Sequence, residues 1–181
     1  MLFRSFLAQR RFDDARARFE RALEKDPAFQ VARMNLARLA LAAQRPDDAA
    51  AAYEQIIKQD PGHLGALMGM AVLASARDDE AEAERLLMQA NAANPRALQP
   101  IVVLAEAYLR KNDGLKANSL LSGLPPEQSE VPAVLRLKGM ALLQTGDFAS
   151  AMFTLNKLTE TQPDSIERSE ERRVGKECRS R

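Results

Sequence analysis

Histidine is the side chain that most often supplies a general base or a metal ligand near neutral pH, and this chain of 181 residues contains one, His63. A zinc site takes three or four protein ligands from Cys, His, Asp or Glu. No cysteine or carboxylate cluster lies at ligand spacing from His63, so the sequence indicates no metal site. We interpret His63 as a solvated residue in the turn that precedes an apolar run.

Two pairs of adjacent carboxylates, Asp47–Asp48 and Asp78–Asp79, could divide acid and base roles. Each pair stands where a helical pattern begins. Aspartate at that position accepts hydrogen bonds from free N–H groups and interacts favourably with the helix dipole, so helix capping accounts for both pairs. The Gly-rich phosphate-binding motifs and the G-x-S-x-G nucleophile motif are missing. We therefore expect neither enzyme activity nor a cofactor.

Three closely spaced arginines, Arg16, Arg18 and Arg21, could contact phosphate groups. Acidic residues stand among them at helical spacing, which is typical of a solvated helix face with i,i+4 pairs; they are Asp13, Asp14, Glu20 and Glu24. Over the whole chain, 26 Lys and Arg oppose 25 Asp and Glu. The resulting charge of +1 favours no nucleic-acid partner.

The last fourteen residues, 168–181, read RSEERRVGKECRSR and contain the only cysteine, Cys178. Codon by codon, they match the conceptual translation of a common short-read sequencing adapter. We interpret 168–181 as translated adapter, disordered and separate from the fold; a genuine charged tail is the alternative. The residues before it carry 20 basic and 22 acidic side chains, a net charge of −2, and no cysteine.

No segment is apolar enough to cross a membrane. The longest uncharged stretch, Leu64–Ala76, has thirteen residues, whereas a spanning helix needs about 20. The opening residues MLFRSFLAQRR have too short an apolar part for a secretory signal and no small-residue cleavage site. We expect a soluble chain of the bacterial cytoplasm or periplasm, and the sequence leaves the compartment open.

Proline marks a period of 34 residues: Pro27, Pro61 and Pro95 are evenly spaced, and Pro163 follows 68 residues later, with Ser129 at the skipped position. An alanine stands twelve residues before each of these anchors: Ala15, Ala49, Ala83, Ala117 and Ala151. A large apolar residue stands eight before: Phe19, Tyr53, Leu87, Leu121 and Leu155. A small residue stands twenty-four before in the complete units: Ala37, Ala71, Ala105 and Gly139.

Each period contains two segments with apolar residues at helical spacing. A polar break separates them, reading RRFDD, QRPDD, ARDDE, KNDG or TGDF. The second helix should stop before the proline, which disfavours helical backbone in the preceding residue and suits the first turn of the next helix. The small positions, and Gly65 with Gly69, let helices approach closely. Because one hairpin cannot bury both its faces, we expect an all-α solenoid of antiparallel helix pairs.

This pattern resembles the tetratricopeptide repeat family over residues 3–165, with small residues at the eighth and twentieth consensus positions, a large one at the twenty-fourth and Pro at the thirty-second. The fourth position, where the family usually has Trp, holds Arg33, Leu67, Ile101 and Leu135. The resemblance implies a right-handed α-solenoid over 1–165 and a binding scaffold rather than an enzyme. Its five units would be 1–27, which is truncated, 28–61, 62–95, 96–129 and 130–163.

The segment 122–132, SGLPPEQSEVP, interrupts the second helix of the fourth unit. Gly123 and Pro125–Pro126 should end that helix early, although the alanine register continues beyond it. We interpret the interruption as a tolerated loop variant; a hinge or a partner contact is the alternative.

In the family, the first helix of each unit lines the concave face. The resemblance therefore implies an apolar groove that binds a protein or peptide, lined by Met34, Arg38, Leu41, Met68, Val72, Val102, Glu106, Arg110, Arg136 and Met140. Methionine suits adaptable apolar contacts. The clamp of Lys, Asn and Arg with which chaperone-binding members hold a terminal carboxylate is missing. For the methionines, ordinary packing between units, or docking by further repeats, is the alternative.

Residues 91–121 and 153–165 are similar to long bacterial repeat lipoproteins that accompany exosortase (PEP-CTERM) protein sorting and exopolysaccharide loci. The signal peptide and lipid anchor that precede the repeats in that family are not seen here. The similarity implies a role in those processes for a longer parent protein.

Two functions stay open. The first is a scaffold that binds a peptide or helix; the second is a purely structural segment of a longer array, with no ligand of its own. Met1 falls inside the first helix of unit one, and no polar capping helix follows Leu158. On the second hypothesis, Met152, Phe153 and Leu155 would lie partly exposed, and uncapped ends would self-associate.

Overall fold

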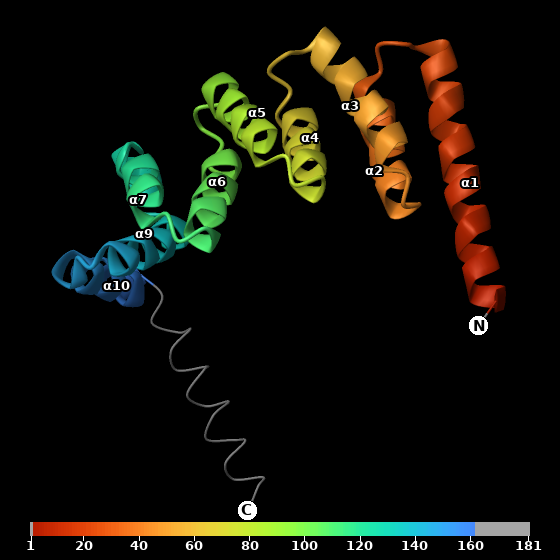
Figure 1. Ribbon diagram of the computed structural model, residues 1–181. Coiled ribbons are helices and arrows are strands. Elements are labelled where there is room, and N and C mark those ends of the chain that lie inside the picture. Colours follow the sequence, from red (N-terminus) through yellow and green to blue (C-terminus); the bar gives the residue numbers. More distant parts are fainter. Residues whose placement is uncertain (1, 162–181) are drawn as a thin grey trace, which may run out of the picture. The chain divides into compact units, whose positions relative to one another are not determined.

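The structure, a computed structural model, describes residues 2–161, and within that range the chain consists of helices and turns without a strand (Figure 1). The ten helices of this range are α1 (Leu2–Lys25), α2 (Gln30–Ala42), α3 (Pro46–Gln59), α4 (Leu64–Ala76), α5 (Glu80–Ala93), α6 (Gln99–Arg110), α7 (Gly114–Ser122), α8 (Pro126–Ser129), α9 (Pro132–Thr145) and α10 (Phe148–Thr161). The chain divides into two compact units, the second beginning at Ile101. The all-α class is confirmed; the interpretation of 168–181 lies outside the described residues.

The first unit is built from helical hairpins that pack on one another. α2 packs against α3 and α4 against α5, while α1 packs on α2 and α3 packs on α4. The centre of this packing is a cluster of buried side chains from α2, α3 and α4: Ala37, Ala40, Ala49, Ala50, Tyr53, Ile56, Ala66 and Leu73. Because this core needs helices from two hairpins, neither hairpin could bury its apolar surface alone.

The repeated small and large positions are buried or half-buried throughout. Four of the five alanines twelve residues before an anchor are buried: Ala49, Ala83, Ala117 and Ala151. The small residues of the first helices are buried as well: Ala37, Ala71, Ala105 and Gly139. The large positions are buried at Tyr53, Leu87 and Leu121 and half-buried at Phe19 and Leu155. The prediction of close helix contacts at these positions is confirmed.

Two glycines show how a small position accommodates a large one. A Cβ placed on Gly69 of α4 would overlap the buried ring of Tyr53 in α3. A Cβ placed on Gly139 of α9 would lie 2.5 Å from the Cδ2 atom of Leu155 in α10. Glycine therefore provides the space that the larger partner fills, between two hairpins at Gly69 and within one hairpin at Gly139.

The turn inside each hairpin repeats one backbone device every 34 residues. Its central residue has a left-handed conformation, at Gln44 (φ 59°), Asp78 (φ 59°), Asn112 (φ 57°) and Gly146 (φ 81°). The N–H of that residue donates to the carbonyl three residues earlier, and the N–H of the next residue donates to the carbonyl five residues earlier. These are the two bonds of a Schellman motif, which satisfies the free carbonyl groups at a helix C-terminus.

The residue after each left-handed position is the N-cap of the following helix. Asp79, Asp113 and Asp147 each accept a hydrogen bond on Oδ1 from the N–H three residues later, at 3.1 Å. The first copy differs, because its N-cap is Arg45 and it makes no side-chain cap bond. There, Pro46 opens α3, a position that its fixed φ favours.

The predicted break at residues 10–14 is wrong, because α1 continues through it as one helix of 24 residues (Figure 1). At the positions of the left-handed residue and the N-cap, this segment has Arg10 and Arg11. Arginine is a good helix former and has no acceptor for a cap bond. Phe12 follows where Pro46 stands in the next unit, so nothing in this segment ends one helix or begins another.

The prolines at the period end the second helices but do not start the next ones. α1, α3 and α5 end two residues before Pro27, Pro61 and Pro95, and the following helices begin three or four residues after them. The prolines thus lie in the connecting turns, and their predicted place in a first helical turn is wrong. Side-chain bonds order these turns: Asp60 Oδ1 accepts from the Gly62 N–H at 3.1 Å, and Asn94 Nδ2 donates to the Gly62 carbonyl at 2.8 Å.

The second unit contains the interrupted helix that the sequence predicts. α7 has nine residues and ends at Ser122, before Gly123, and the single turn α8 follows. α7 packs on α9, and α9 packs on α10. Gly114 permits the first of these contacts, since a Cβ there would lie 2.8 Å from the carbonyl oxygen of Ala141. Lys157 of α10 pairs with Glu130, which follows α8, so the interruption is tied to the last helix.

Candidate functional site

The first unit brings two of the predicted binding stripes together. Met34, Arg38 and Leu41 follow one another at helical spacing along α2, and Met68 and Val72 do so along α4. Val31 precedes Met34 on the same stripe of α2 and is added here to the predicted residues. The side chain of Met34 reaches across to α4, because a Cβ on Gly65 would lie 3.0 Å from its terminal methyl group. We call the surface formed by these six residues the α2–α4 face.

Exposure divides the α2–α4 face into a supporting layer and a contact layer. Met34 and Leu41 pack against the buried cluster of the unit, and Met68 is half-buried. Val31 and Val72 each keep 59% of their surface exposed, although both are apolar. Arg38 is exposed. The methionines therefore serve packing in part, while the two valines and the arginine are free to contact a partner.

The charge on the α2–α4 face is entirely positive. α2 contains two arginines and no acidic residue, and α4 contains no charged residue. Arg33 is occupied, since it donates to the Pro27 carbonyl and to Gln59 Oε1. Arg38 forms no ion pair within residues 2–161. Its charge acts on Tyr53: burial raises the pKa of that hydroxyl, and Arg38 opposes the rise.

The second unit has a corresponding surface, the α6–α9 face, formed by Val102, Glu106 and Arg110 of α6 and Arg136, Met140 and Leu143 of α9. Arg136 Nη2 lies 3.2 Å from Glu106 Oε1, in an ion pair between the two helices. Met140 is 41% exposed and Leu143 is 45% exposed. Val102 is half-buried, and Arg110 is exposed.

Each face can therefore offer apolar contact together with a few charged groups, as an interaction surface for a peptide or helix requires. Nothing in either face provides a nucleophile beside a base. Leu109, which precedes Arg110 on α6, is buried, and its carbonyl accepts a hydrogen bond from Gln144 Nε2. That position fixes α6 against α9 and is not available to a partner.

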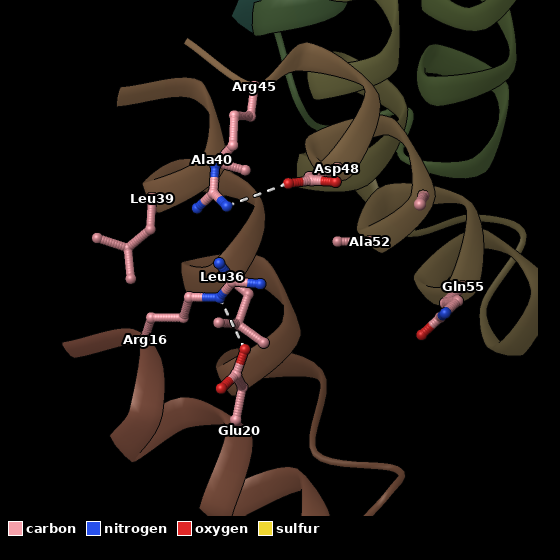
Figure 2. Close-up of a pocket in the computed structure, with 10 residues that line it drawn as sticks. Arg16, Glu20, Leu36, Leu39, Ala40, Arg45, Asp48, Ala52 and Gln55 are labelled. Carbon is pink, nitrogen blue, oxygen red and sulfur yellow. Dashed lines mark hydrogen bonds and ion pairs between the residues drawn. The ribbon is translucent and has the colours of Figure 1, made fainter. Parts of the chain in front are cut away.

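The first unit also has a pocket that sequence reasoning missed. It has a volume of about 230 Å³ and lies among α1, α2 and α3, on side chains of α2 other than those of the α2–α4 face (Figure 2). Leu36, Leu39 and Ala40 line it from α2. Two ion pairs border it: Arg16 to Glu20 at 2.7 Å and Arg45 to Asp48 at 3.4 Å.

Arg16, one of the charged residues that line this pocket, is already engaged in an ion pair. Glu20 both bonds to and attracts the Arg16 guanidinium, which raises the pKa of Arg16, so this arginine is held by its own helix. The predicted i,i+4 pair at Arg16 is confirmed. The apolar stripe of α2 that lines the pocket is visible in the sequence. Only the packing of α1 on α2 shows that part of this stripe stays uncovered.

The residues considered for chemistry have structural roles. His63 is the N-cap of α4, and its Nδ1 accepts from the Ala66 N–H at 3.1 Å. The prediction of a solvated turn residue leaves out this capping role. Asp79 caps α5 as predicted. Asp47 and Asp48 lie in the first turn of α3 without capping it, and Asp47 pairs with Arg77 at 2.7 Å.

Neither a metal site nor a membrane span is found among the described residues. No three His, Cys, Asp or Glu side chains in that part of the chain come together so that they could hold a metal ion. None of its helices is both long enough and apolar enough to span a membrane.

Comparison with protein families gave three matches, each to a model described as tetratricopeptide repeat. They fall on residues 1–63, 40–99 and 135–165 and together cover well over half of the chain. A comparison with curated proteins gave no match.

Solved structures share this architecture. MamA is similar with a TM-score of 0.68 and 18% identity, over 88% of this chain and 87% of that one. YrrB, described as a TPR protein with an unusual peptide-binding site, has a TM-score of 0.63 and 19% identity, over 80% and 75%. A thermophilic TPR protein from Thermus thermophilus has a TM-score of 0.55 and 22% identity, over 92% and 91%. At these identities the likeness shows the fold.

Proposed function

The chain belongs to the tetratricopeptide repeat family, and from that premise we propose that it is a protein-interaction scaffold whose first-helix faces bind a peptide or a helix of a partner. Proteins with these repeats typically act as scaffolds rather than as enzymes. The peptide-binding site for which YrrB is described supports this assignment by analogy. The binding surfaces in this proposal are the α2–α4 face and the α6–α9 face.

The observation that carries the proposal is the exposure of apolar side chains on the α2–α4 face. Val31 and Val72 are each 59% exposed, and half-buried methionines lie beside them. Methionine side chains adapt to different apolar partners. A binding peptide that covered these residues would remove apolar surface from water, and that removal stabilises a complex by about 25 cal/mol per Å² before the costs of association.

A peptide selection tests the face directly. Peptides from a random displayed library are selected against the full chain, and their affinities for two variants are compared. Val72→Asp places a charge in the α2–α4 face, and Ala81→Asp makes the same kind of change at an exposed position of α5. We expect about tenfold or greater weakening for Val72→Asp, because a carboxylate opposes burial, and little change for Ala81→Asp. Selected peptides that bind both variants alike would place the binding surface elsewhere.

A structural role is the second candidate, and exposed apolar residues of α10 favour it. Phe148, Met152 and Phe153 are 65%, 64% and 74% exposed, as predicted for Met152 and Phe153. Contiguous exposed apolar surface marks interaction sites or self-association. If this role is correct, light scattering should show a mass that rises with concentration, and Phe148→Ser combined with Phe153→Ser should return the chain to a monomer. A monomer at every concentration before substitution would remove this candidate.

The likeness of residues 91–121 and 153–165 to bacterial repeat lipoproteins supports a narrower proposal for the partner. On that basis, the partner is a component of exosortase-type protein sorting or of exopolysaccharide assembly. Affinity purification of the tagged chain from its source bacterium, followed by mass spectrometry, should recover such a component with the unchanged chain and lose it with Val72→Asp. Recovery of the same proteins with both would contradict the assignment.

A further inference from the structure

We propose that the α2–α4 face takes an acidic amphipathic segment: a helix or strand of a partner that sets apolar side chains on Val31 and Val72 and a carboxylate beside Arg38. The inference rests on the proposed function and adds the chemistry of the partner. It depends on how charge is distributed between first and second helices.

Charge is segregated between the two kinds of helix. The first helices α2, α4, α6 and α9 carry five basic residues and one acidic residue, Glu106. The second helices α3, α5, α7 and α10 carry seven acidic and four basic residues. The formal charge of +1 for the whole chain hides this separation. A surface of one sign attracts partners of the opposite sign and disfavours like-charged ones.

Within the first unit, the positive charge of the face belongs to Arg38. The other arginine of α2, Arg33, is held by the Pro27 carbonyl and by Gln59. Arg38 is exposed and forms no ion pair in the part of the chain that the structure describes. α2 and α4 offer it no carboxylate, because neither helix contains one. An arriving carboxylate could therefore pair with Arg38 without displacing an existing partner.

Arg38 lies within the apolar stripe of α2, so a segment that packs on the stripe also contacts this charge. Arg38 lies one helical turn from Met34 and nearly one from Leu41 on the same stripe of α2. A segment that packs on the stripe places residues three or four apart on it. The matching sequence therefore has apolar residues at helical or alternating spacing and Asp or Glu at the intervening contact position.

Two designed peptides of about 18 residues, long enough for a marginal helix, provide the test. Both carry leucines at helical spacing; one has Glu at the flanking positions, and the other has Lys. Their affinities for the full chain are measured by fluorescence anisotropy at low and at high ionic strength. The variants are Arg38→Glu and a matched control, Lys58→Glu, which makes the same charge change at an exposed position of α3. Circular dichroism verifies that each variant is folded.

We expect the Glu peptide to bind about three- to tenfold more tightly than the Lys peptide, with a preference that weakens as salt rises. Arg38→Glu should reverse the preference, and Lys58→Glu should leave it in place. A Lys58→Glu effect as large as that of Arg38→Glu would overturn the inference in favour of a whole-chain charge effect.

Other outcomes separate the inference from the proposed function. Equal binding of both peptides, lost in Val72→Asp, would overturn the acidic partner and leave the binding face intact. Binding of neither peptide would also overturn it, while the library selection decides about the face. Sedimentation that shows self-association abolished by Arg38→Glu would assign the face to a second copy of this chain, which equally overturns the inference.

Discussion

Gln44 is the least suited of the four equivalent left-handed turn residues, and replacing it with glycine should stabilise the first unit. Left-handed backbone costs an ordinary L-residue about 1–2 kcal/mol, whereas glycine adopts it freely. The equivalent position of the last hairpin is already a glycine, Gly146. The position before it in the series is Asn112, and asparagine tolerates left-handed backbone. The Gln44 side chain forms no hydrogen bond with the described residues, so its removal should cost little.

The magnitude follows from two opposing terms. Gln44→Gly removes the left-handed penalty of about 1–2 kcal/mol. Glycine also has more freedom to lose on folding, which costs about 0.5–1 kcal/mol. The net gain should be about 0.5–1 kcal/mol, or roughly 2–8 °C in the unfolding midpoint of a unit of this size. Urea unfolding of the full chain, followed by circular dichroism, would measure it.

Matched variants in the second unit control for the turn itself. Asn112→Gly should change stability by only a few tenths of a kcal/mol, because Asn is already tolerated there. Gly146→Ala should destabilise by more than about 1 kcal/mol, and for a purely backbone reason, since a Cβ there meets no atom within 4 Å. The reasoning fails if Gln44→Gly leaves the transition unchanged while Asn112→Gly raises it.

Three other predictions follow from the packing and the caps. Arg33→Leu should stabilise the chain by about 1 kcal/mol, because Arg33 Nε is buried without a hydrogen-bond partner among the described residues; destabilisation in urea would show that its remaining bonds prevail. Gly69→Ala should lower stability by about 1–2 kcal/mol through overlap with the Tyr53 ring, whereas Gly65→Ala, which meets a flexible methionine, should be nearly neutral; equal losses would contradict the difference. Bonds from Ser150 hold the pKa of Asp147 below its ordinary value, so its stabilisation is present above about pH 4 and is lost as pH falls through the folded pKa. Asp147→Asn keeps an acceptor and should flatten that acid dependence in pH-resolved unfolding, and an unaltered slope would exclude the cap as its source.

The sequence predicts the architecture because buried positions are constrained by volume. A small residue that faces a large one across a helix contact tolerates few replacements, so the alanine and large apolar positions repeat visibly and are buried or half-buried. The nine-residue α7 is predictable for a similar reason, since Gly123 and the two prolines leave the backbone few options.

The wrong predictions concern residues whose type is compatible with more than one local backbone conformation. The polar character of residues 10–14 predicts a break, but a polar segment without an acceptor at the N-cap position, a proline or a left-handed residue continues as helix in α1. The connecting prolines were placed in a first helical turn, although the bonds made by Asp60 and Asn94 stabilise a separate turn. Polarity alone does not distinguish a solvated helix from a loop.

The binding faces are less predictable than the fold because their positions change from unit to unit. One position of the first helix holds Arg38, Val72, Glu106 and Met140, and another holds Met34, Met68, Val102 and Arg136. Packing fixes these side chains only in part, so they can differ from unit to unit, and that freedom gives each unit its own contact chemistry. The ion pair between Glu106 and Arg136 shows the consequence: in the second unit one arginine of the face pairs with a carboxylate of the same face, whereas in the first unit Arg38 stays available. Specificity in this chain should therefore depend on the positions that the repeat leaves unconstrained.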